Sequence, residues 1–292
     1  MKYLSVSEIA KVWGISERSV RNYCASGQID GAYLVGKTWN VPEDAIKPAR
    51  KNASGGLLER LQYEMKNGVS GGIYHKIQID LTYNSNHIEG SRLTHDQTRY
   101  IYETNTVGVE QSALNVDDIV ETANHFKCVD MIIQNAKRPL SEAFIKELHR
   151  VLKSGTSDSR KSWFAVGDYK RLPNEVGGNE TALPKDVSAR VKELLSTYNA
   201  IENVGFEDIL DFHHKFEIIH PFQDGNGRIG RLITFKECLR NNIVPFIIDE
   251  NLKPYYYRGL NEWRKVRGYL KDTCLSAQDT FKTYLDYFKI KY

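Results

Sequence analysis

The sequence predicts a mainly α-helical protein with a small β-hairpin, preceded by a small module of two helices and a hairpin. Three observations indicate this fold class. Most segments after residue 57 carry apolar residues at helical spacing, and residues 1–48 follow a different pattern. Residues 165–183 are rich in glycine, proline and asparagine. We therefore expect two domains, at residues 1–48 and 57–292.

The bulk properties exclude several classes of protein. The chain has 292 residues, 41% hydrophobic and 26% charged, as in an ordinary globular protein. Its net charge of +3 is too small to indicate nucleic-acid binding by itself. No apolar run has the length of a membrane span, and the N-terminus leads into a charged segment, unlike a signal peptide. The four cysteines lack zinc-ligand spacing, so we expect a cytoplasmic protein with ordinary thiols and no membrane partner.

The first fifty residues have the pattern of a helix-turn-helix with a wing. Ser5 is a predicted helix N-cap, and a second N-cap at Ser16 follows a turn at Gly14. Residues 29–41 then alternate as a β-hairpin does. The module resembles the winged helix of excisionase and MerR-type DNA-binding proteins.

That resemblance implies binding to duplex DNA. Arg18, Arg21 and Asn22 would face a major groove, with Lys37 on the wing. The charge density of the module is modest, so docking onto a protein stays the alternative. Residues 49–56, rich in glycine and polar residues, are the predicted linker.

Ten helices are predicted in the second domain from apolar residues that recur on one face. Their expected ranges are 57–66, 73–88, a short helix from 95, 116–136, 141–152, 186–201, 206–219, 228–239, 254–267 and 273–290.

Residues 220–231, the signature run His-Pro-Phe-Gln-Asp-Gly-Asn-Gly-Arg-Ile-Gly-Arg, carry most of the predicted chemistry. Pro221 disfavours the α conformation at His220, so the preceding helix should end there with the imidazole at its tip. Gly225 and Gly227 free the backbone, so that successive N–H groups can point at one anion where the next helix begins.

Two arginines near the start of that next helix conflict with its dipole. Arg228 and Arg231 lie three residues apart on one face, where a polyphosphate would compensate for the repulsion. Asp224 is placed to hold magnesium between the phosphates. His220 titrates near neutrality and is the candidate general base for an incoming hydroxyl.

The signature run resembles the motif HPFx(D/E)GNGRxxR of Fic-domain proteins and matches it at every fixed position. The family is mostly helical and typically transfers AMP from ATP to a tyrosine, threonine or serine hydroxyl of a protein. The resemblance implies that His220 deprotonates the target, that Asp224 binds Mg2+ and that Phe222 anchors the loop. The phosphates would be held by a further set of residues in the run: Gly225, Asn226, Gly227, Arg228 and Arg231.

Residues 165–183 resemble the β-hairpin flap with which Fic proteins hold an extended target segment. Tyr169, Leu172 and Val176 are its candidate target contacts. Family flaps commonly carry an arginine where this chain has Lys170, so a bidentate contact is not expected there. A plain surface loop is the alternative.

Residues 85–90, Ser-Asn-His-Ile-Glu-Gly, end the helix predicted from residue 73. A glutamate at the negative end of a helix dipole needs a partner. The hexapeptide resembles the inhibitory motif (S/T)xxxE(G/N) of Fic proteins, and its position upstream of the signature run implies a self-inhibited class. By that resemblance Glu89 pairs with Arg231, supported by Ser85, and takes the space of the ATP γ-phosphate. A partner, or a change in a homo-oligomer, that pulls the helix away would relieve the inhibition.

Residues 253–261 resemble the family's helix beside the adenine. Tyr256 is predicted to pack on the base, with Asn261 nearby. A tyrosine buried in the core is the alternative for this position.

The leading hypothesis is a protein adenylyltransferase that modifies another protein or itself. Removal of AMP is one alternative, since relatives use the inhibitory glutamate to position water. Transfer of another phosphoryl group is a second, which the intact Gly-Asn-Gly-Arg run disfavours. A transcription regulator that only senses nucleotide is a third. The complete set of His220, Asp224, Arg228 and Arg231 argues against it, because sensing requires no base.

Overall fold

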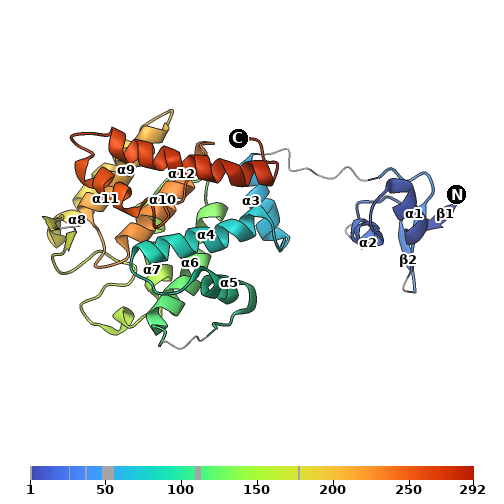
Figure 1. Ribbon diagram of the computed structural model, residues 1–292, viewed down its shortest axis with the longest axis horizontal. Coiled ribbons are helices and arrows are strands. Elements are labelled where there is room, and N and C mark those ends of the chain that lie inside the picture. Colours follow the sequence, from blue (N-terminus) through green and yellow to red (C-terminus); the bar gives the residue numbers. More distant parts are fainter. Residues whose placement is uncertain (1, 26, 37, 48–55, 109–112, 177) are drawn as a thin grey trace. The chain divides into compact units, whose positions relative to one another are not determined.

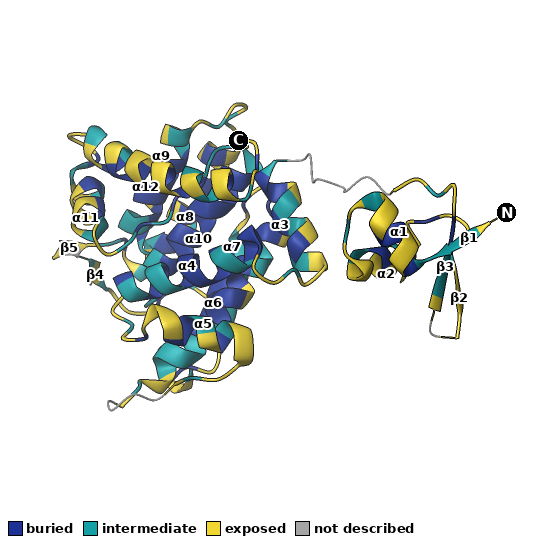
Figure 2. Ribbon diagram, turned by 45° about the vertical axis from the view of Figure 1, so that its right-hand side comes forward, coloured by how far each residue is buried: buried dark blue, intermediate teal, exposed yellow. Residues whose placement is uncertain are grey.

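Helix α10 (Asn226–Arg240) lies at the centre of the larger part of the chain. Every residue from Arg228 to Leu239 is buried, and the helix contacts α3, α4, α6, α7 and α9. Figure 2 shows it in dark blue among the surrounding helices. The charged residues on α10 therefore need partners from these neighbours, because an unpaired buried charge is strongly destabilising.

The computed structural model describes residues 2–25, 27–36, 38–47, 56–108, 113–176 and 178–292, except for the side chain of Asn179. The chain divides into two compact units, Met1–Ser54 and Gly55–Tyr292 (Figure 1).

The smaller unit contains two helices and a three-stranded antiparallel sheet of order β1-β3-β2. Ser5 and Glu8 form a capping box on the first helix, and Gly14 ends it in the left-handed conformation (φ 63°). The hairpin was predicted from the sequence, whereas the short strand β1 was not. The elements are β1 (Tyr3–Ser5), α1 (Val6–Trp13), α2 (Glu17–Ala25), β2 (Tyr33–Val35) and β3 (Thr38–Pro42).

The larger unit is helical, as predicted, with one two-stranded hairpin. Its elements are α3 (Leu57–Lys66), α4 (Ile73–Ile88), α5 (His95–Thr104), α6 (Val116–Gln134), α7 (Glu142–Lys153), a 3-10 turn (Asp158–Arg160), β4 (Glu175–Val176), β5 (Asn179–Glu180), α8 (Pro184–Asn199), α9 (Phe206–Ile219), α10, α11 (Lys253–Glu262) and α12 (Gly268–Tyr287).

Several helix boundaries differ from the prediction by one to five residues. Helix α10 begins two residues earlier than expected, because Gly225 caps it in the left-handed conformation (φ 82°). Helix α11 ends at Glu262 rather than at 267, and α12 begins at Gly268 rather than at 273. Helix ends depend on local caps that apolar periodicity does not detect.

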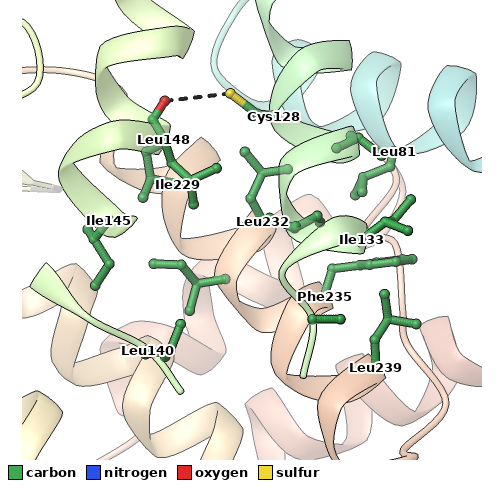
Figure 3. Packing of buried hydrophobic residues seen from close by; sticks show 14 of the residues in the cluster. Leu81, Cys128, Ile133, Leu140, Ile145, Leu148, Ile229, Leu232, Phe235 and Leu239 are labelled. Carbon is green, nitrogen blue, oxygen red and sulfur yellow. Dashed lines mark hydrogen bonds between the residues drawn. The ribbon is translucent and has the colours of Figure 1, made fainter. Parts of the chain in front are cut away.

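The main core packs α6 and α7 against α10 (Figure 3). Leu148 on α7 and Ile229 and Leu232 on α10 are fully buried there. Cys128 on α6 donates from Sγ to the Leu148 carbonyl oxygen (3.5 Å). This packing fixes the N-terminal turn of α10, where the signature run leads into the helix.

The cysteines and the helix lengths agree with the composition. All four cysteines are free and buried. Among the described residues, no helix is both long and apolar enough to cross a bilayer.

The contact between α11 and α12 depends on Gly259. A Cβ atom at this position would lie 2.5 Å from Leu270 Cα and 2.6 Å from Leu270 N, both backbone atoms that cannot turn away. We predict that Gly259→Ala lowers the free energy of unfolding by about 1–3 kcal/mol, as overpacking does. Urea unfolding would measure this. Gly268→Ala is the matched control, because its Cβ would meet only Asp272 Oδ2, at 3.9 Å. Equal stability of the two variants would contradict the prediction.

Candidate active site

His220 stands at the end of α9 in a strained backbone conformation. Its φ of 48° and ψ of 63° lie in the left-handed region, and its N–H donates to the Phe216 carbonyl oxygen (2.9 Å). Burial, and then the nearby ammonium of Lys170, lowers the pKa of the imidazole to about 4. His220 is therefore neutral at neutral pH, which is the form that can accept a proton.

The loop after His220 is held by Asn226. The N–H of Phe222 donates to Asn226 Oδ1, and Asn226 Nδ2 donates to the Phe222 carbonyl oxygen, both at 2.8 Å. The Asn226 side chain is almost fully buried by these contacts. These bonds make the Asn226 side chain a brace of the loop, and the contact of Asn226 with phosphates stays a prediction.

Glu89 reaches the first turn of α10 from the end of α4. A Cβ atom at Gly227 would lie 2.2 Å from Glu89 Oε1, so a side chain there would displace the carboxylate. An acid at the C-terminal end of α4 is unfavourable there, but it now lies at the positive end of α10. The local conflict seen in the sequence is resolved by this second helix.

Arg231 is the direct partner of Glu89. Its Nη2 donates to Glu89 Oε1 (2.6 Å) and to the Ser85 carbonyl oxygen (2.8 Å). Its Nε donates to Ser85 Oγ (3.0 Å). The structure thus brings together the three residues that the sequence grouped as an inhibitory contact.

Arg228 lies in a second buried cluster of charges. Its Nη1 donates to Glu121 of α6, and its Nη2 donates to Asp224 Oδ2 (3.1 Å). Lys153, at the end of α7, donates to the same Asp224 oxygen (2.6 Å) and to Glu121. Burial opposes ionisation of Asp224, but Arg228 and Lys153 hold the pKa of its carboxyl well below the usual range.

The Asp224 carboxylate fits the magnesium ion that the sequence predicted. Both cation contacts end on Oδ2, and the side chain remains 47% exposed. No group of three or more metal-ligating side chains occurs among the described residues. A magnesium ion at Asp224 would therefore take its other ligands from phosphates and water, as magnesium in nucleotide sites does.

A cavity of about 310 Å³ opens between the flap (residues 165–183), α9 and α11. Asn261, predicted near the nucleotide base, lines it. Tyr256 does not. That ring is buried and pairs its hydroxyl with His213, which favours the alternative of a tyrosine in the core. The neighbouring Tyr257 lines the cavity. The other lining residues are Val176, Glu180, Thr181, His214, Glu217, Ile218, Leu260 and Arg264.

The three candidate flap residues have different surroundings. Val176, in β4, lines the cavity. Leu172 is 46% exposed, and its N–H donates to Gln223 Oε1 of the signature run (3.2 Å). Tyr169 packs at the base of the flap against Phe222, with ring centroids 6.0 Å apart.

Lys170 anchors the flap. Its side chain is buried, and Nζ donates to Asn174 Oδ1 and Thr181 Oγ1 (both 2.6 Å). Its N–H donates to the Pro221 carbonyl oxygen (2.9 Å). Burial lowers the pKa of Lys170 to about 8. Lys170 thus connects both sides of the hairpin to the signature run.

Glu217 is a site residue that the sequence analysis missed. Its Oε2 lies 3.9 Å from His220 Nδ1, and its Oε1 lies 4.0 Å from His213 Nδ1. Burial, opposed by Arg231 and reinforced by Glu89, raises its pKa to about 8. Its position three residues before His220 on α9 was the available signal, because residues at that spacing share a helix face.

The candidate DNA-contacting residues of the smaller unit lie on α2. Arg18, Arg21 and Asn22 are exposed there. Arg21 pairs with Glu17 (2.6 Å). Lys37, predicted on the wing, lies outside the described residues.

Comparison with known proteins identifies a Fic/DOC match. Residues 139–237 match the model of the Fic/DOC family. This range runs from α7 into α10 and contains the whole signature run. A solved Fic domain containing signaling protein from Bacteroides thetaiotaomicron VPI-5482 is 27% identical, with a TM-score of 0.58. The alignment covers 79% of this chain and 90% of that one. These matches support a Fic/DOC domain in this part of the chain.

Two curated relatives carry the name protein adenylyltransferase Fic. The protein from Aedes aegypti is 29% identical over 182 residues, which cover 61% of this chain and 36% of that protein. The protein from Nematostella vectensis is 25% identical over 210 residues, which cover 70% of this chain and 48% of that protein. The chain spans less than half the length of either relative.

Proposed function

We propose that this chain is a protein adenylyltransferase, which transfers AMP from ATP to a hydroxyl of a target protein or of itself. The observation that carries the proposal is the meeting of Arg231, Gly227 and a carboxylate at the N-terminal turn of α10. This is the environment of an anion, and an inhibitory carboxylate stands where a phosphate would bind. The names of the curated relatives support the same activity.

The nucleotide would extend from the cavity to the first turn of α10. The base and ribose would lie in the cavity beside Tyr257 and Asn261. Glu217 lines that cavity and also approaches His220, so the cavity adjoins the candidate general base. The phosphates would then meet the amides after Gly225 and the guanidinium of Arg231.

The reaction moves one proton and exchanges one bond. The target oxygen attacks the α-phosphorus and forms a new bond to it. The bond between the α-phosphorus and the oxygen that bridges to the β-phosphate breaks, and pyrophosphate leaves. His220 takes the hydroxyl proton, because its lowered pKa keeps the imidazole neutral. A magnesium ion held by Asp224 would neutralise phosphate charge.

Glu89 makes the resting chain self-inhibited in this proposal. Arg231 is buried and hydrogen-bonded to Glu89 and Ser85. An outer phosphate needs the same guanidinium, so it competes with Glu89 for one partner. Displacing the end of α4 would release Arg231 for the nucleotide.

The position of a radioactive label tests the reaction class. A chain with the carboxylate removed (Glu89→Gly) should become labelled by ATP carrying ³²P at the α-position and not at the γ-position, because AMP keeps only the α-phosphate. His220→Ala in the same background should lose the label. It should still bind ATP, since the imidazole acts on the hydroxyl. Label from the γ-position would indicate phosphoryl transfer instead.

The acidic limb of the pH profile tests the base. A histidine with a pKa of about 4 stays neutral as pH falls through 6.5, the value of an ordinary histidine. We predict that kcat/KM of the Glu89→Gly chain stays level between pH 7 and 5.5 at saturating magnesium, a window below the pKa of about 8 of the neighbouring Glu217 and Lys170. A fall with a midpoint near 6.5 would show that the imidazole is not shielded as the structure indicates.

We propose, as a separate function, that the smaller unit binds duplex DNA. The exposed α2 carries Arg18 and Arg21, and the β2–β3 hairpin has the form of a wing. The Arg21–Glu17 ion pair would have to open, which a surface pair allows at a cost of about 0.3–0.5 kcal/mol.

DNA binding by the full chain should weaken steeply with salt, because phosphate contacts release counterions. Arg18→Ala or Arg21→Ala should reduce the slope of log K against log salt by about one if the side chain contacts a phosphate. Lys2→Ala is the control, because Lys2 is an exposed cation outside α2 and pairs with Glu43. A flat salt response in a gel-shift titration would favour docking onto a protein.

A further inference from the structure

Lys153 is the most deeply buried cation beside the signature run. Its side chain is 2% exposed, yet it lies within hydrogen-bond distance of three carboxylates. These are Asp224 (2.6 Å), Asp158 (3.1 Å) and Glu121. An ammonium group has three donors, so all of them are used. Lys153 has no donor left for a nucleotide.

Glu121 connects this lysine to Arg228. It comes from α6 and accepts from both Lys153 and Arg228 Nη1. Arg228 Nη2 then points at Asp224 Oδ2 (3.1 Å). Two functional charges of the signature run, Asp224 and Arg228, are therefore each held by a charge from outside the run.

We propose that Lys153 and Glu121 are positioning residues for metal and nucleotide binding, a role that rests on the proposed adenylyltransferase function. Asp224 lies in a loop and is 47% exposed, so it needs an anchor to keep one orientation. Arg228 bonds Asp224 through Nη2, which a phosphate would also attract, whereas all donors of Lys153 are already taken by carboxylates. Lys153 is therefore the steadier anchor for Oδ2, and Glu121 fixes Arg228 through its other nitrogen, Nη1.

Lys153 could also weaken magnesium binding instead of supporting it. A cation 2.6 Å from the metal-binding carboxylate repels a magnesium ion and competes for its oxygen. If repulsion dominated, removing Lys153 would tighten magnesium binding. If orientation dominates, as we propose, removal weakens it. Repulsion and orientation therefore predict opposite changes in magnesium binding when Lys153 is removed.

The experiment is calorimetric titration of the full chain carrying Glu89→Gly, which frees Arg231, with ATP, once with magnesium and once with EDTA. Lys153→Met should weaken ATP binding about 10- to 100-fold in magnesium, the range found when groups that orient metal ligands are removed. It should leave binding in EDTA unchanged, which a merely structural defect would not do. Lys153→Arg, which keeps the charge, should restore part of the magnesium effect. Asp158→Asn is the matched control, because Asp158 contacts Lys153 and neither Asp224 nor Arg228.

Loss of a buried lysine leaves carboxylates unpaired, so thermal melting accompanies each titration. The double variant Lys153→Met with Glu121→Gln removes one charge of each sign and should show the same loss in magnesium. Unchanged or tighter binding in magnesium by a folded Lys153 variant overturns the positioning role. Absence of ATP binding by the Glu89→Gly chain, in which Arg231 is free of its carboxylate, overturns the proposed function itself, which separates the two failures.

Discussion

Helix α10 buries two arginines near its start, and each has to be neutralised where it lies. Arg231 meets Glu89 from the end of α4, and Arg228 meets Glu121 from α6 together with Asp224. Leaving either charge unpaired in this core would cost several kcal/mol. The surrounding helices are therefore not only a hydrophobic shell, because they deliver the counter-charges that allow an anion-binding helix start to be buried.

This constraint links the proposed inhibition to stability. In the absence of nucleotide, the carboxylate of Glu89 satisfies Arg231 and lies against Gly227. A bound polyphosphate would satisfy the same arginine, so the folded chain has two alternative anions for one cation. The Glu89 side chain is 28% exposed at the end of its helix, whereas the Arg231 side chain is only 7% exposed. The glutamate is thus the partner that is free to move, and an agent that displaces the end of α4 would switch the site.

The sequence predicted those parts of the site that are local in the chain. The signature run placed His220, Asp224 and Arg231 together, and the unfavourable dipole position of Glu89 indicated that it needed a distant partner. The helices followed from apolar periodicity. Periodicity did not decide which of the adjacent Tyr256 and Tyr257 is buried, because both rings are large and amphipathic. The contact of Tyr256 with His213, from another helix, decides it. Lys153 and Glu121 belong to other helices, and no local pattern relates them to Asp224.

The most direct test of the account is the rate of AMP incorporation in four chains: unaltered, Glu89→Gly, Arg231→Ala and the double variant. A charge-assisted pair contributes about 1.5–3 kcal/mol, so Glu89→Gly should be faster than the unaltered chain by about 10- to 150-fold. The double variant should be as inactive as Arg231→Ala alone, because both anions depend on the same guanidinium. Equal rates for the unaltered chain and Glu89→Gly would contradict the claim that this contact controls the site.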